Sequence, residues 1–209
     1  MRNKIIIVDD HIAIIAGVSI ILEQSIEGLE IDHAEDYPES LEKISNNHYD
    51  LVILDINLPG GKQKEMIKEI KEQNKDIKIL VFSSYDESIG VQYIQHGADG
   101  YLNKLSDEKE IISAVKQILE TGNYFSPQVI KLLLDANSRK TPINPFDKLS
   151  AREKEICDLL IQGNGNLEIS NILDIKLTTV STYKMRIYKK LEVNNLAELV
   201  ILSQKYSAV

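Results

Sequence analysis

Short apolar runs alternate with longer amphipathic stretches over the first 121 residues, and this alternation restricts the fold more than any other feature. We predict strands at Lys4–Val8, Leu29–His33, Leu51–Leu54, Lys78–Phe82 and Gly100–Leu102. The stretches between them have helical periodicity, over roughly residues 11–25, 38–46, 63–73, 87–96 and 107–120. Strands that alternate with helices form parallel sheets with helices on both faces. The sequence therefore predicts an α/β domain with a five-stranded, doubly wound parallel sheet.

The alternation stops after Gly122. Ser126 and Pro127 are typical of the start of a short helix, and "ANSRKTPINPFD", residues 136–147, has the prolines and the lack of periodicity of a linker. Beyond Leu149 the pattern predicts only helices, at about residues 150–161, 166–173, 177–190 and 195–205. We therefore divide the chain into an α/β domain at 1–121, a short helix and linker at 122–146, and a small all-α domain at 147–209.

The composition excludes several classes of protein. The chain has 209 residues and a single cysteine, Cys157, which rules out an intrachain disulfide and favours a reducing compartment such as the cytoplasm. It contains no run of about 18 apolar residues, so we expect no membrane-spanning helix. The four histidines, His11, His33, His48 and His96, lack the spacing of zinc ligands.

Acidic side chains follow two of the predicted strands. Asp9 and Asp10 end the first strand and Asp55 ends the third, so they meet at one sheet edge if these strands are neighbours. Crowded carboxylates repel one another unless a cation joins them, and Mg²⁺ suits oxygen ligands. Ser83 and Lys104 reach the same edge from the fourth and fifth strands. A cation, a lysine and a hydroxyl suit a phosphoryl group on a carboxylate, for which Asp55 is the central candidate.

The motifs "VDD", "LVILDINLP", "VFSS" and "GYLNK" occur in the order found in response-regulator receiver domains, so the first domain resembles this flavodoxin-like family. The resemblance implies that Asp55 accepts a phosphoryl group from a sensor histidine kinase. It also implies that Asp10, Asp55 and the carbonyl of Asn57 bind Mg²⁺, while Asp9 helps through a water molecule.

Three more residues take roles from the same resemblance: Ser83 as the switch hydroxyl, Lys104 as a phosphate contact, and Tyr101 as the aromatic that rotates when the site is filled. Each has a simpler interpretation, as a loop serine, a surface charge and a half-buried aromatic. Asp10 taken alone is best explained as a helix cap, worth about 1 kcal/mol. The joint placement of these residues at one edge favours the functional interpretation.

The loop after Pro59 departs from the receiver pattern. Receivers usually have an acidic residue or asparagine followed by glycine where this chain has Lys62 and Gln63, after an early Gly60 and Gly61. We expect a looser and more basic loop, which bears on kinase recognition more than on the phosphoryl chemistry.

A basic stripe distinguishes the second domain within a chain of net charge −8. Residues Ile175–Leu191 contain five basic side chains and no acidic one. In this segment Val180, Tyr183, Ile187 and Leu191 recur at helical spacing and define one buried face. The preceding "NLEISNILDI" predicts another short helix, so the pair indicates a helix-turn-helix whose second helix enters the major groove. The simpler alternative for the basic run is a solvated helix face.

"LSAREKEICDLLIQGNGNLEIS" and "TTVSTYKMRIYKKLEVNN" resemble the opening and the recognition helix of the LuxR/GerE-type domain of NarL/FixJ-class regulators. By position, this resemblance implies that Ser181, Thr182 and Met185 face bases. Phosphate contacts then fall to Lys184, Arg186, Lys189 and Lys190.

Two departures from the LuxR/GerE pattern concern the recognition helix. Lys176 replaces the usual Ser or Thr cap, so Thr178, otherwise on the DNA-facing side, is a candidate cap for a later start. Ser181 and Met185 replace basic residues, which disfavours direct readout of guanine.

Together these features predict a DNA-binding response regulator of a two-component system, in which phosphorylation of Asp55 switches sequence-specific DNA binding and transcription. We expect a homodimer on phosphorylation or on DNA, with RNA polymerase as a candidate partner, and no turnover activity. One alternative is a constitutive DNA-binding regulator whose receiver is a phosphate-independent interaction module. A second is an aspartate-nucleophile phosphatase, which normally needs an aspartate as general acid where this chain has Asn57.

Overall fold

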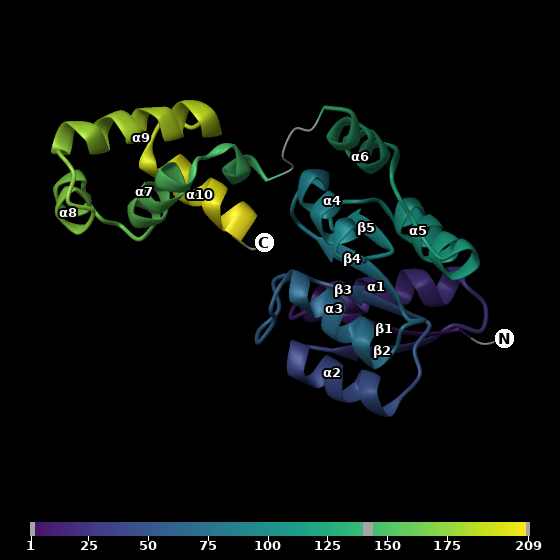
Figure 1. Cartoon of the computed structure of the whole chain (residues 1–209). Coiled ribbons are helices and arrows are strands. Elements are labelled where there is room, and N and C mark those ends of the chain that lie inside the picture. The colour runs from purple at the N-terminus through teal and green to yellow at the C-terminus, as the bar shows by residue number, and fades with distance from the viewer. Residues whose placement is uncertain (1–2, 140–143, 208–209) are drawn as a thin grey trace. The chain divides into compact units, whose positions relative to one another are not determined.

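The computed structural model describes residues 3–139 and 144–207, and the chain divides into two compact units between Asp135 and Ala136 (Figure 1). Within these residues the first unit contains a five-stranded parallel sheet in the order β2-β1-β3-β4-β5. The strands are β1 (Lys4–Val8), β2 (Glu30–Ala34), β3 (Leu51–Leu54), β4 (Lys78–Ser83) and β5 (Gly100–Asn103). The predicted α/β fold is confirmed, and β1 and β3 are neighbours as the acidic site requires.

Four helices connect the strands and a fifth follows β5, and together they cover both faces of the sheet. They are α1 (Ile12–Ser25), α2 (Tyr37–Asn46), α3 (Lys64–Gln73), α4 (Glu87–Gln95) and α5 (Glu108–Thr121). Helices α1 and α5 pack on one face, against alternate strand residues such as Ile5 and Ile53, and α2, α3 and α4 lie on the other (Figure 1). Because β1 and β3 are buried on both faces, their sequences are continuous apolar runs rather than alternating ones.

Helix α6 (Pro127–Arg139) begins where the sequence predicts and ends later. The Ser126 hydroxyl accepts a hydrogen bond from the Val129 amide at 3.2 Å, which caps the first turn. The helix includes residues 136–139, so the predicted linker starts too early. Those four residues contain neither proline nor glycine, and nothing in them stops a helix that has already begun. Residues 140–143 of the predicted linker lie outside the described residues.

The second unit consists of helices around a small core. After a single 3₁₀ turn, η1 (Pro145–Lys148), come α7 (Ala151–Ile161), α8 (Asn166–Ile172), α9 (Leu177–Leu191) and α10 (Leu196–Ser207). Val180, Ile187 and Leu191 on α9 are buried as predicted, and Tyr183 is partly buried against the same cluster. Within residues 3–139 and 144–207, no helix is both long and apolar enough to span a bilayer.

Helix α9 starts earlier than the alternative cap assignment requires. Lys176 occupies its N-cap position, and Thr178 lies within the first helical turn. The prediction that Thr178 caps a later start is therefore wrong. The turn before α9 contains Asp174 at φ 48°, a left-handed conformation that aspartate tolerates better than most residues.

Candidate functional site

Backbone pairing places Asp9 and Asp55 beside each other at the carboxyl edge of the sheet. The Asp55 amide donates to the Val8 carbonyl at 2.9 Å, and the Asp9 amide donates to the Ala34 carbonyl at 3.1 Å. Both bonds continue the parallel pairing one residue past the strands. The two carboxylates are therefore positioned by the sheet rather than by a flexible loop.

Lys104 joins these two carboxylates. Its ammonium lies 2.6 Å from Asp9 Oδ2 and 2.9 Å from Asp55 Oδ2, and all three side chains are buried. Burial alone would lower the pKa of Lys104, but the hydrogen bonds and charges of Asp9 and Asp55 outweigh burial and raise it. The lysine therefore carries a full positive charge against the two carboxylates.

A wider acidic cluster opens from this pair toward solvent. One potential ligand atom from each of Asp9, Asp10, His11 and Asp55 lies within 4.8 Å of the others, with Asp10 and His11 exposed. The cluster could hold a metal ion, and its carboxylate oxygens suit a hard divalent cation. Asn57 belongs to the same site, because its amide donates to Asp55 Oδ1 at 3.3 Å.

His11 was missed by the sequence analysis. Its Nδ1 lies 2.7 Å from Asp10 Oδ1 and 3.0 Å from Asp9 Oδ1. Its position directly after two aspartates at a strand end was the available signal. His11 is also the N-cap residue of α1, so the alternative interpretation of Asp10 as the helix cap is wrong.

Ser83 and Tyr101 are both connected to the backbone of Tyr85. Ser83 is fully buried, and its Oγ accepts a hydrogen bond from the Tyr85 amide at 3.3 Å. The Tyr101 hydroxyl and the Asn103 side-chain amide donate to the Tyr85 carbonyl at 2.6 Å and 2.7 Å. Burial raises the pKa of Tyr101, so its hydroxyl stays protonated as a donor. The candidate switch residues therefore share one contact in the β4–α4 loop, which no sequence motif indicated.

The ring of Tyr101 is buried rather than half-buried at the sheet edge. It lies against Gly90 of α4 so closely that a Cβ atom added there would be 2.2 Å from the ring Cγ. Only glycine leaves room for the aromatic ring in this orientation.

The unusual loop after Pro59 is held by specific contacts. Gly60 has φ 71° and lies against Pro38, and Gln63 has φ 57° and ψ −122°, a conformation that non-glycine residues rarely adopt. The Lys62 ammonium pairs with Glu69 at 2.9 Å, so the loop presents less free positive charge than its sequence suggests.

The predicted DNA-binding residues lie along the outward side of α9, where Lys184 is half-buried and the others are exposed. Two cations lie over aromatic rings: Lys184 Nζ is 5.6 Å from the Tyr188 ring centroid, and Arg186 Cζ is 5.8 Å from that of Tyr183. These contacts hold the cations along the flanks of the helix.

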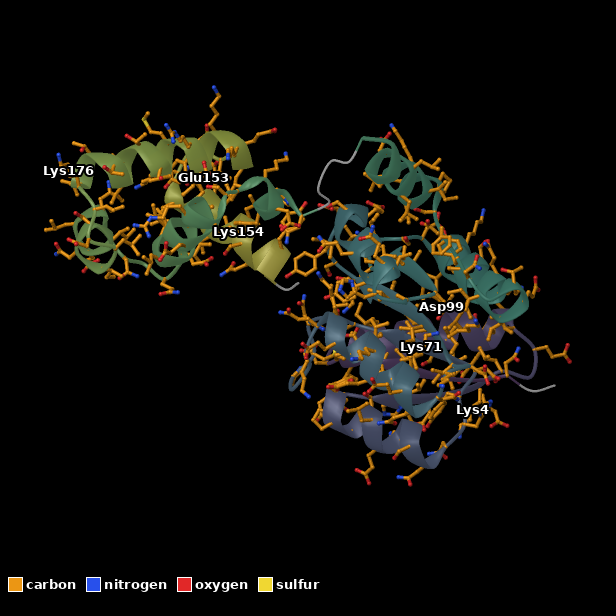
Figure 2. All side chains as sticks on the ribbon, in the orientation of Figure 1. Lys4, Lys71, Asp99, Glu153, Lys154 and Lys176 are labelled. Carbon is orange, nitrogen blue, oxygen red and sulfur yellow. The ribbon has the colours of Figure 1, made fainter. Side chains whose placement is uncertain are left out.

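Lys190 is used within the domain. Its ammonium lies 2.6 Å from Glu153 Oε2 and donates to the Lys148 carbonyl at 3.2 Å, which connects the end of α9 to the start of α7, where Figure 2 labels Glu153. The hydrogen bond from Lys190, followed by that from the Ser150 amide, lowers the pKa of Glu153 to about 2. The sequence predicted only a phosphate contact for Lys190, and its ion pair with Glu153 was not foreseen.

Comparison with known proteins assigns both units to families. Residues 5–116 match the response regulator receiver domain, and residues 147–203 match the bacterial regulatory proteins of the luxR family. The chain is 33% identical to the oxygen regulatory protein NreC of Staphylococcus carnosus over 94% of each chain. It is 30% identical to the fimbriae Z protein of Escherichia coli K12 over 99% of each chain.

Solved structures agree with these assignments. The chain is similar to the response regulator RcsB in a complex with DNA, with a TM-score of 0.74, 26% identity and coverage of 100% of both chains. Three features of the chain agree with these matches: the order of the two units, the sheet edge that holds Asp9, Asp55 and Lys104, and the helix-turn-helix. The chain belongs to the two-component response regulators of the NarL/FixJ class, which join a receiver domain to a LuxR-type DNA-binding domain.

Proposed function

We propose that Asp55 accepts a phosphoryl group from a sensor histidine kinase and thereby controls DNA binding by the second domain. The observation that carries this proposal is the buried Asp55 carboxylate, 2.9 Å from the Lys104 ammonium and beside Asp9. A carboxylate oxygen attacks the phosphorus, the donor's imidazole leaves, and an acyl phosphate forms on Asp55. The Lys104 ammonium is placed to stabilise the added negative charge.

The acidic cluster is proposed to bind Mg²⁺ through Asp10, Asp55 and the carbonyl of Asn57, with Asp9 acting through water. The oxygen-rich donor set fits this ion, since Mg²⁺ takes oxygen ligands and retains several waters. When bound, the ion supplies charge neutralisation for the phosphoryl oxygens. His11 holds Asp9 and Asp10 from the solvent side through the contacts of its Nδ1.

The phosphoryl acceptor can be tested directly. Purified protein is incubated with acetyl phosphate and Mg²⁺, and the phosphorylated fraction is separated by phosphate-affinity electrophoresis. Asp55→Asn should remove labelling, whereas the exposed control Asp76→Asn should label as the unchanged chain does. Undiminished labelling of Asp55→Asn would refute the assignment.

The proposed output is repositioning of Ser83 and Tyr101, which changes the face formed by the fourth and fifth strands and helices, β4, β5, α4 and α5. Both side chains bind the Tyr85 backbone, so a movement of Ser83 toward a phosphoryl oxygen also removes support from the tyrosine. The charge added at Asp55 thereby shifts the equilibrium between two arrangements of Ser83 and Tyr101.

We propose that α9 binds double-stranded DNA and that two copies bind together, as expected if the operator has two-fold half-sites. The structure of RcsB with DNA supports the DNA partner. Helix α1 offers a surface for the second copy, because Ile12 and Ile20 are 66% and 54% exposed and Gly17 between them faces open space. Ala16→Lys on this surface should weaken dimerisation in sedimentation experiments; an unchanged dimer would exclude it.

We propose that the protein acts in the cytoplasm, where kinase and DNA are both accessible, and that RNA polymerase is a further partner. We also propose that it is not a turnover enzyme. At position 57 the phosphatase alternative needs a carboxylic acid, and an asparagine amide cannot serve as general acid. Sustained hydrolysis of phosphate esters by the purified protein would favour the phosphatase instead.

A further inference from the structure

Three exposed residues on α9, Ser181, Thr182 and Met185, lie opposite its buried face and are the side chains expected to face base edges. This inference rests on the proposed DNA binding and concerns which bases are preferred. A recognition helix distinguishes base pairs through the donors, acceptors and apolar groups that it presents to the major groove.

The two hydroxyls on this face are already hydrogen-bonded inside the protein. Ser181 Oγ donates to the Leu177 carbonyl at 3.1 Å and accepts from the Asn166 side-chain amide at 3.3 Å. Thr182 Oγ1 donates to the Thr178 carbonyl at 2.9 Å. A threonine hydroxyl that bonds back to the preceding helical turn leaves its methyl group directed away from that turn. The single donor of each hydroxyl is therefore used inside the protein, and toward DNA the two hydroxyls can only accept hydrogen bonds.

Met185 adds an apolar surface next to that methyl group. Its side chain lies one helical turn from Ser181 and Thr182 and is 71% exposed. A thioether is a weak acceptor and carries no donor. The exposed end of the Met185 side chain therefore offers DNA an apolar surface.

Two cations of α9 are already engaged within the domain. Arg186 is held over the Tyr183 ring and Lys190 pairs with Glu153, so neither stands free as a donor beside Thr182 and Met185. The helix contains no asparagine or glutamine, the side chains that read adenine by paired hydrogen bonds. Paired readout of guanine or adenine is therefore unavailable to Ser181, Thr182 and Met185.

We propose that Thr182 and Met185 read the C5-methyl groups of thymines, so that the preferred half-site has T·A pairs opposite these residues. The thymine methyl is the apolar group that the major groove presents, and threonine methyl groups and other apolar side chains contact it. The flanking cations then supply affinity through the phosphates, without sequence preference.

The test uses the full chain, treated with acetyl phosphate and Mg²⁺, to select sites from a random double-stranded DNA library. The selected site is then synthesised with deoxyuridine in place of individual thymines, which removes only the methyl group. We expect binding to weaken about fourfold for each contacted thymine, the equivalent of one buried methyl group. Thr182→Ser and Met185→Ala should lose this difference between thymine and uracil, whereas Lys189→Ala should weaken binding to both DNAs equally.

The outcomes separate this inference from the proposed function. A G·C-rich selected site, or equal affinity for thymine and uracil DNA, would overturn thymine readout while leaving DNA binding intact. Failure to bind any member of the library would overturn the proposed function itself, and the inference with it.

Discussion

The ion pair between Lys190 and Glu153 gives a quantitative prediction about the stability of the second domain. Replacing Lys190 with methionine keeps most of the aliphatic side chain and removes the ammonium that lies 2.6 Å from Glu153 Oε2. The Glu153 side chain is nearly fully buried at the start of α7, where it also accepts from the Ser150 amide at 2.7 Å. Loss of the ammonium leaves a buried carboxylate with only part of its stabilisation.

The expected magnitude follows from the pKa of Glu153. A decrease from the ordinary value of 4.5 to about 2 corresponds to about 3 kcal/mol. The Lys190 side chain is 41% exposed, so solvent screening reduces the contribution, and we expect a loss of about 1–2 kcal/mol at pH 7. Because folding lowers this pKa, the stabilisation is present above about pH 4.5 and is lost as the pH falls toward 2.

Two NMR measurements test this prediction. Urea unfolding followed through the amide signals of α7 and α9 gives the free energy of unfolding of this domain, and carboxyl chemical shifts give the pKa of Glu153. The exposed neighbour Lys189 is the matched control. Lys189→Met should keep the free energy of unfolding within about 0.5 kcal/mol of that of the unchanged chain. It should also flatten the salt dependence of DNA binding. Equal losses of stability in Lys190→Met and Lys189→Met would refute the reasoning, as would an ordinary pKa for Glu153 in the unchanged chain.

Three further changes test the receiver domain. Lys104→Met leaves Asp9 and Asp55 without their shared ammonium. In urea unfolding with EDTA, we expect the free energy of unfolding to fall by about 3 kcal/mol. Added Mg²⁺ should then stabilise this variant more than it stabilises the unchanged chain. Gly90→Ala places a Cβ 2.2 Å from Cγ of the Tyr101 ring. We expect the free energy of unfolding to fall by about 1–3 kcal/mol, or the NMR signals of the ring to shift as it moves aside. Unaltered stability and unaltered spectra would exclude this packing. Gln63→Gly should raise stability by about 1 kcal/mol, because glycine accepts φ 57° and ψ −122° without strain, and a measured decrease would contradict this.

The sheet and its acidic edge could be predicted because each depends on local patterns with a fixed geometric meaning. A fully apolar run followed by aspartate indicates a buried parallel strand and the position of its carboxyl end, as Lys4–Val8 and Leu51–Leu54 show. The carboxyl ends of all five strands lie at one edge of the sheet, where the long Lys104 side chain, from the end of β5, reaches Asp9 at the end of β1.

Other features depend on contacts that carry no sequence periodicity. The partner of Lys190 lies on another helix, 37 positions earlier, and basic residues on one stripe look alike whether they face DNA or an internal carboxylate. The Tyr85 carbonyl, which binds Tyr101, is a backbone group and leaves no residue-type signal. The late end of α6 was missed because prolines in the following segment suggested a linker, although they restrict only the residues beside them.

The central claim is that phosphoryl transfer to Asp55 controls DNA binding. The most direct measurement is the affinity of the full chain for a selected DNA site, by fluorescence anisotropy, with and without acetyl phosphate in the presence of Mg²⁺. We predict at least about tenfold tighter binding on phosphorylation, the equivalent of about 1.4 kcal/mol, and no response in Asp55→Asn. Equal affinity of the two forms, or an undiminished response in Asp55→Asn, would contradict the claim.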